Sequence, residues 1–115
     1  MVKATGIGGF FFRSRDKAAL AQWYETHLGI TEIWMQQAGM TVFSPFKEDT
    51  DYMPAGKQWM LNVRVDSIAS AIVDLNAAAI AVETRPEWDT PETGRFARIH
   101  DPEGNTIELW EPPAD

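Results

Sequence analysis

The most constraining feature of this 115-residue sequence is an internal repeat in the order of its predicted elements. Hydrophobic periodicity predicts strand, helix, strand, strand in residues 5–56, and the same order again in residues 57–113. The aspartates that begin the two predicted helices, Asp16 and Asp66, are 50 positions apart. Two copies are too few for a solenoid, which needs three or more. The repeat therefore predicts one pseudo-symmetric domain over residues 1–115.

Seven segments have the composition and alternation of strands. They are residues 5–14, 31–36, 40–46, 58–65, 80–85, 95–100 and 106–111. Gly29 ends the first predicted helix, and Ala79 ends the second at the same repeat position. Asp101 to Asn105 predicts a turn, because proline presets φ and the Gly-Asn pair tolerates a positive φ. We expect an α+β fold in which mixed sheets curve around a cavity, with the helices on the outer face.

The composition indicates a globular domain without a nucleic-acid or membrane partner. The chain is 44% hydrophobic and contains no cysteine, which excludes disulfides, thiolate metal sites and cysteine nucleophiles. Its net charge of −7, with the basic residues scattered, disfavours binding to nucleic acid. No apolar run approaches the roughly 18 residues that cross a membrane, and the N-terminus has no secretory pattern. We therefore expect a cytoplasmic protein.

Two segments at opposite ends of the repeat carry a recognisable pattern. The matching residues are Gly8 to Phe12, Asp16, Leu20-Ala21, Trp23-Tyr24 and His27 to Ile30 at the start, and Asp101 to Glu111 at the end. Together they resemble the vicinal oxygen chelate superfamily, which includes glyoxalase I, bleomycin resistance proteins and extradiol dioxygenases. The resemblance covers about residues 5–113. It implies a glyoxalase-like domain of two βαβββ-type modules, whose curved mixed sheet surrounds a cup-shaped cavity that holds a small molecule.

The resemblance also implies a divalent metal, held by His, Gln or Glu on the first and last strands of each module. In this sequence the first-strand positions are Gly9 and Met60, or Trp59 if the register shifts by one. The last strand of the second module keeps Glu108, and only Asp51 could replace the ligand missing from the first module. One carboxylate does not hold a metal ion, so we expect no metal site and no cofactor. A divalent metal is the alternative if the strand register differs.

Strand alternation predicts which side chains face the cup, because successive side chains point to opposite faces of a sheet. The apolar partners in each strand should face the helices, which leaves the polar and aromatic residues for the cup. The predicted ligand-binding residues are Phe11, Arg13, Met60, Asn62, Arg64, Phe96, Arg98 and Trp110, with Glu108 beside them. Aromatic walls with a few convergent polar groups are typical of a ligand pocket.

The charged residues of this set have more than one interpretation. Arginine can clamp a carboxylate or phosphate through two parallel hydrogen bonds, which would suit an anionic ligand. Alternatively, the arginines pair with Glu108 and neighbouring acids, or the face is partly a dimer interface. Glu108 itself is either a catalytic general base or a former metal ligand that Arg64 or Arg98 neutralises.

A long polar loop between the two halves predicts a cover for the cup. Residues 47–56 are too many for a tight connection, and they include Tyr52 and Met53. We expect these two side chains to fold over the cup as a lid.

The sequence leads to one function hypothesis with two alternatives. The chain is expected to be a glyoxalase/bleomycin-resistance-like protein that binds a small aromatic or anionic molecule in the cup without a complete metal site. One alternative is a metal-dependent lyase or dioxygenase of the same superfamily. The other is a non-catalytic protein that sequesters a toxic compound. A chain this short leaves sheet edges that a second copy could cover, so we also expect a homodimer.

Overall fold

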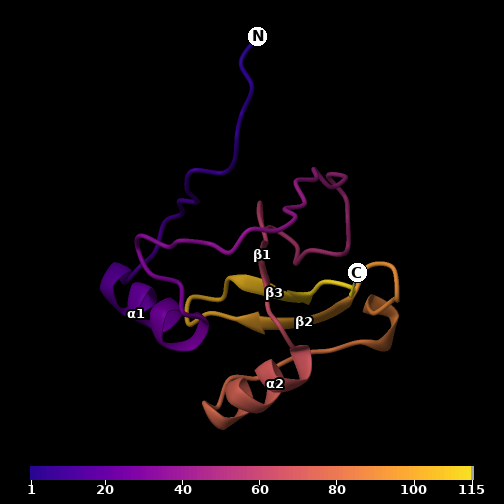
Figure 1. Ribbon diagram of the computed structural model, residues 1–115. Coiled ribbons are helices and arrows are strands. Elements are labelled where there is room, and N and C mark those ends of the chain that lie inside the picture. The colour runs from indigo at the N-terminus through magenta and orange to yellow at the C-terminus, as the bar shows by residue number, and fades with distance from the viewer. Residues whose placement is uncertain (115) are drawn as a thin grey trace.

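A computed structural model describes residues 1–114 of the chain and contains two α-helices and three strands (Figure 1). In chain order the elements are α1 (Lys17–Leu28), β1 (Leu61–Arg64), α2 (Ile68–Ala77), the short 3-10 helix η1 (Pro86–Trp88), β2 (Arg95–His100) and β3 (Thr106–Glu111). Within this described part of the chain, no helix has the length and apolar character needed to cross a bilayer.

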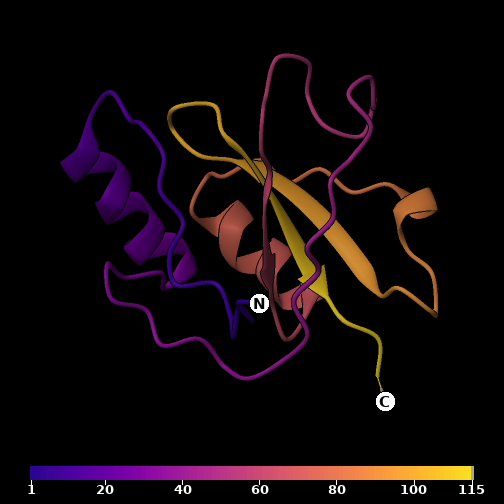
Figure 2. The same ribbon diagram turned by 90° about the horizontal axis from the view of Figure 1, so that it is seen from above.

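The three strands form one open, mixed sheet in the order β1-β3-β2. β3 is the central strand, with β1 parallel and β2 antiparallel to it. The helix α2 covers one face of this sheet, and the chain between α1 and β1 crosses over the opposite face (Figures 1 and 2). The predicted α+β class is therefore confirmed, and the two faces of the sheet have different neighbours.

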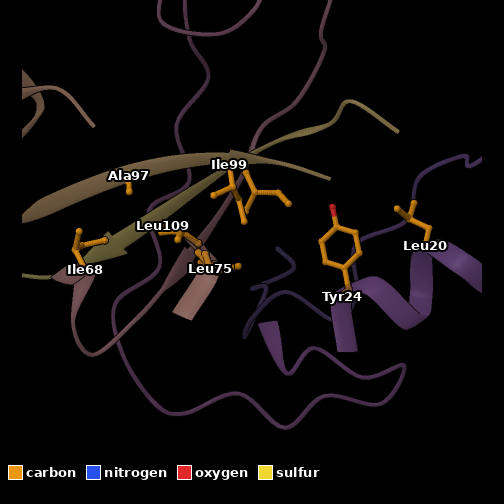
Figure 3. Packing of buried hydrophobic residues seen from close by; sticks show 9 residues of the cluster. Leu20, Tyr24, Ile68, Leu75, Ala97, Ile99 and Leu109 are labelled. Carbon is orange, nitrogen blue, oxygen red and sulfur yellow. The ribbon is translucent and has the colours of Figure 1, made fainter. Parts of the chain in front are cut away.

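The core lies on the α2 side of the sheet, as strand alternation predicts. Alternate residues of β2 and β3 are fully buried there, and α1 and α2 add their apolar faces (Figure 3). The buried hydrophobic cluster is Leu20, Tyr24, Val63, Ile68, Leu75, Ala97, Ile99, Ile107 and Leu109. Because these side chains occupy one face, the residues between them in sequence must point to the other face.

The helix ends follow the sequence signals closely. Asp16 is the N-cap of α1, where its side chain accepts a hydrogen bond from the backbone N–H of Ala19 at 3.1 Å. Gly29 ends that helix with φ at 67°, the left-handed conformation that glycine adopts without strain. The second helix is capped by Ser67, one residue after the predicted start. Ala79 follows the end of α2 with φ at 61°, so Gly29 and Ala79 share the left-handed conformation at matching positions of the repeat.

The predicted turn at Asp101 is also a structural junction between α1 and the sheet. Asp101 is buried, and its Oδ1 accepts from the backbone N–H groups of Glu103 at 2.8 Å and Asn105 at 3.0 Å. Its Oδ2 accepts from the Asn105 side chain at 2.8 Å and from the Tyr24 hydroxyl at 2.7 Å. Burial and this hydrogen bond to Asp101 raise the pKa of Tyr24 well above its usual range. The turn thus fixes α1 against the last hairpin.

The first half of the chain differs from the sequence prediction. Residues 5–14, 31–36 and 40–46 form no strand in the described structure, so the predicted arrangement of two modules around a cup is not confirmed. Their large apolar side chains are exposed instead, including Ile7, Phe10, Phe11, Ile33, Met35, Met40, Val42 and Phe43. Strand-type alternation predicts a half-buried surface, and a surface becomes buried only where a neighbour covers it. Among residues 1–114 the cover is only partial: Phe10 contacts the Trp59 ring and is still 46% exposed.

In the second half, the strand predicted at 80–85 is reduced to one contact. Glu83 forms an isolated antiparallel bridge with Arg98, through backbone hydrogen bonds of 2.8 and 2.9 Å. The strand predicted at 58–65 is also shorter, since β1 covers only its last part. The described structure therefore contains one three-stranded sheet with a covered apolar face, in place of the two predicted sheets.

Candidate functional site

The face of the sheet opposite α2 brings six of the predicted cup residues together. The register places them in two cross-strand rows, Asn62–Glu108–Arg98 and Arg64–Trp110–Phe96. The strand order β1-β3-β2 produces these rows, because β1 and β2 flank the central strand β3 and each strand contributes one residue to each row. We call this surface the cup face.

Glu108 is the buried centre of the cup face. It is 5% exposed, and its Oε1 accepts a hydrogen bond from the Asn62 side-chain amide at 2.7 Å. Its Oε2 accepts from the hydroxyl of Tyr52. Within residues 1–114 the ion pairs are Arg85–Glu83 and Arg95–Asp89, so the described chain gives Glu108 no arginine partner. The neutralising arginine expected from the sequence is replaced by two uncharged donors.

Arg98 lies beside Glu108 between two aromatic rings. Its guanidinium carbon is 4.5 Å from the centre of the Tyr52 ring and 4.8 Å from that of Trp88. One terminal nitrogen donates to the backbone carbonyl of Tyr52 at 2.5 Å, while Nε is buried without a hydrogen-bond partner. Guanidinium groups stack well on aromatic faces, so this arrangement stabilises a flat cation inside the site.

Tyr52 is the residue through which the loop 47–56 contacts the cup face. It is half-buried, and its ring makes an edge contact with Phe46 at 5.8 Å between centres. Burial and the hydrogen bond to Glu108 raise the pKa of Tyr52 to about 12. Met53 is also half-buried. The structure therefore places the predicted lid residue Tyr52 against the predicted cup.

Phe96 and Trp110 form an aromatic surface next to this cluster. Their rings are nearly parallel, at 8°, with centres 6.3 Å apart. The Trp110 indole N–H donates to the backbone carbonyl of Thr93 at 2.7 Å, which fixes the plane of the ring. Trp110 is 8% exposed and Phe96 is half-buried, so the two rings form an apolar wall beside the Glu108 cluster.

Arg64 belongs to the second row, but its guanidinium is hydrogen-bonded to backbone carbonyls of the same chain. Its terminal nitrogens donate to the backbone carbonyls of Gln37 at 2.8 Å and Ala38 at 3.3 Å. This guanidinium therefore holds the segment between α1 and β1 against the sheet. Such a contact favours a structural role for Arg64 over the clamping of an anionic ligand.

The remaining predicted lining residues are not brought to the cluster. Phe11 is 91% exposed and Arg13 is exposed, in the segment that forms no strand. Neither makes a hydrogen bond or ring contact with Glu108 or Arg98 among the described residues. Met60 is half-buried just before β1. These three remain sequence predictions that lie outside the observed cluster.

The residues at the implied metal positions do not fit a divalent ion. Both carboxylate oxygens of Glu108 already accept hydrogen bonds, and Met60 offers only a weak thioether ligand. Trp59 packs against Phe10 and Phe12, with ring centres 4.8 and 5.1 Å away. Within residues 1–114, no three histidine, aspartate or glutamate side chains lie close enough together to hold a metal.

Sequence reasoning missed Trp88, which the short helix η1 places over Arg98. A tryptophan among the polar residues of a proline-containing loop was the available signal. The structure also contains a hollow of about 190 Å³ between the end of α1, α2 and β1, and the cup-face residue Arg64 contributes to its lining. Its lining includes His27, Asp74 and the apolar Leu28 and Leu75.

Comparisons with known proteins find solved structures similar to this chain, among them the two described below. No family model matches the sequence, and no curated protein matches it. The chain is similar to TnmS3, an antibiotic binding protein from Streptomyces sp. CB03234, with a TM-score of 0.61 and 22% identity over 97% of this chain and 99% of that chain. It is also similar to a glyoxalase/bleomycin resistance protein from the same organism, with a TM-score of 0.48 and 24% identity over 84% and 91% of the two chains. At 22% identity, the likeness to TnmS3 shows a shared fold.

Proposed function

We propose that this protein binds a small aromatic molecule on its cup face and holds it without chemical change, as a resistance-type binding protein. The observation that carries this proposal is the buried carboxylate of Glu108, held by uncharged donors beside stacked aromatic rings. Binding sites for small molecules combine apolar walls with a few directed polar groups, and the cup face has both. The likeness to an antibiotic binding protein supports the same function.

The electrostatics of the cup face favour an aromatic ligand over an anionic one. Arg64 donates to backbone carbonyls, and Arg98 is stacked between two rings with one nitrogen on the Tyr52 carbonyl. An anion would also meet the carboxylate of Glu108, and like charges at short range repel each other. The two arginines therefore support the walls of the site rather than a clamp for a carboxylate or phosphate.

The same contacts favour sequestration over catalysis. A lyase or dioxygenase of this superfamily needs a metal, and the residues at the implied positions do not fit one. In our proposal Glu108 orients the ligand through a hydrogen bond and does not act as a general base. A ligand that binds and is recovered unchanged is the expected behaviour.

We also propose that the protein acts as a homodimer. The apolar side chains of residues 5–14 and 31–46 are exposed, and β1 is an edge strand whose outer side pairs with no strand among residues 1–114. Exposed edges and apolar patches are the surfaces that a second copy covers. We expect light scattering at micromolar concentration to give twice the chain mass, and a monomer at that concentration would contradict this part of the proposal.

The binding function is tested with a panel of planar aromatic compounds, including antibiotics. We expect some of them to raise the melting temperature, to bind with about one molecule per chain, and to be recovered unchanged by mass spectrometry. Phe96→Leu should weaken their binding, because it removes one of the two stacked rings. Phe43→Leu is the matched control, since Phe43 is 88% exposed and makes no ring contact with the cup face in the described structure. The proposal fails if no compound binds, or if both variants weaken binding equally.

A further inference from the structure

We infer that Tyr52 occupies the ligand position as an internal substitute, and that the ligand is a hydroxylated aromatic molecule that displaces it. This inference rests on the proposed binding function and narrows the class of ligand. A tyrosine side chain is itself a phenol, so its contacts show what chemistry the cup face accepts. The ring faces the Arg98 guanidinium, the hydroxyl donates to Glu108, and Phe46 contacts the ring at a steep angle.

The requirement for a hydroxyl on the ligand follows from the carboxylate of Glu108. An ionised carboxylate only accepts hydrogen bonds, and Asn62 supplies a donor to one oxygen of Glu108 but not to the other. When Tyr52 leaves, the second oxygen loses its protein donor, and a ligand that covers this oxygen and excludes water must donate a hydrogen bond in its place. Sites built to bind a substrate hydroxyl strongly reject analogues that lack it, because a buried polar group is then unsatisfied.

The demand for an aromatic ring follows from Arg98. Its guanidinium carbon lies over the Tyr52 ring at 4.5 Å and over the Trp88 ring at 4.8 Å from the ring centres. Withdrawal of Tyr52 exposes one face of this flat cation, and an aromatic ring is the group that restores the contact. A hydroxyl attached to that ring would then lie in the direction of Glu108, as the Tyr52 hydroxyl does.

The loop that carries Tyr52 is suited to withdrawal. Residues 47–56 contain only turns and bends, with short-range backbone hydrogen bonds such as that from Thr50 to Lys47. Two hydrogen bonds of Tyr52 join the loop to the cup face, one through its hydroxyl and one through its carbonyl. The sequence predicts a lid that covers a bound ligand, and in our inference the same loop carries Tyr52 as a competitor for the ligand's contacts.

The test uses three probes that share the naphthalene ring: β-naphthol, its methyl ether, and β-naphthoate. Binding to the wild-type protein is measured at neutral pH by calorimetry. We expect the methyl ether to bind about ten-fold to a hundred-fold more weakly than β-naphthol, because it lacks the donor for Glu108. The anionic β-naphthoate should be weaker still, because its charge repels that of Glu108.

A pair of matched variants tests the competition directly. Tyr52→Phe removes the competing hydroxyl, so β-naphthol should bind about ten-fold more tightly than to the wild type. Tyr24→Phe makes the same chemical change at a hydroxyl that donates to Asp101, away from the cup face, and should leave the affinity unchanged. Both variants are measured at a temperature at which thermal melts show them folded.

The inference is overturned if the ether or the naphthoate binds as tightly as β-naphthol, or if Tyr52→Phe leaves the affinity unchanged or weakens it. It is also overturned if neither the wild type nor Tyr52→Phe binds β-naphthol. The proposed binding function fails separately, when no compound of the broader aromatic panel binds. A panel compound that binds tightly without a hydroxyl donor would refute the ligand class and leave the binding function intact.

Discussion

Replacing Tyr24 by phenylalanine tests how strongly the turn at Asp101 joins α1 to the sheet. Tyr24 is 7% exposed and Asp101 is 4% exposed, and the hydrogen bond between them is 2.7 Å long. A hydrogen bond to a charged group contributes about 1.5–3 kcal/mol. Asp101 keeps three other donors, from Glu103 and Asn105, so its carboxylate is not left unsatisfied. We therefore expect a loss at the lower end, about 1.5 kcal/mol in the free energy of unfolding.

The loss is measured by thermal and urea unfolding of the variant beside the wild type. For a domain of this size, about 1.5 kcal/mol lowers the melting temperature by roughly 6 °C. Tyr52→Phe is the matched control, because its hydroxyl joins a half-buried surface loop to Glu108, and it should cost less than about 1 kcal/mol. A change below about 2 °C for Tyr24→Phe would show that α1 is not fixed by this contact. Equal losses in the two variants would show that the loop is part of the cooperative core.

Two further predictions concern the loop and the last strand. The pKa of Tyr52 is about 12 in the folded chain against 10.0 ordinarily, so loop closure is fully stable below about pH 10 and is lost as the pH rises through about 12. In ultraviolet titration of the tyrosines, the wild type should show a phenolate step near pH 12 that is missing in Tyr52→Phe. A wild-type step near pH 10 would contradict the closed loop. Gly94→Ala should lower the free energy of unfolding, measured in urea, by about 2 kcal/mol or more. The reason is that Gly94 has φ at 100° and that an added Cβ would collide with the Glu111 carbonyl. A loss under about 0.5 kcal/mol would show that this hairpin end adopts another conformation.

Local signals in the sequence predicted the parts of the fold that local chemistry determines. Asp16 caps the start of α1 and Gly29 ends it, as expected, because capping depends on a few adjacent residues. The alternation in β2 and β3 predicted which side chains enter the core, since Ile99 and Leu109 are fully buried there. The turn at Asp101 was predicted from its proline and glycine.

The parts that depend on long-range neighbours could not be predicted in the same way. The alternation in residues 5–14 indicates a surface that should be half-buried, but it does not say which chain provides the cover. The partners of Glu108 depend on the parallel pairing of β1 with β3, which places Asn62 directly opposite it. The contact with Tyr52 spans 56 positions of sequence and depends on how one loop docks. Charge complementarity alone suggested an arginine there.

The most direct test of the binding site is a proton–nitrogen correlation NMR spectrum recorded while β-naphthol is added to the wild-type protein. We expect the side-chain amide of Asn62 and the indole N–H of Trp110 to shift together with the backbone of residues 47–56, because Asn62 and Tyr52 donate to Glu108 and Trp110 lies in the adjacent row of the cup face. Shifts confined to the hollow that His27 and Asp74 line, with the signals of Asn62 and Trp110 unchanged, would contradict it.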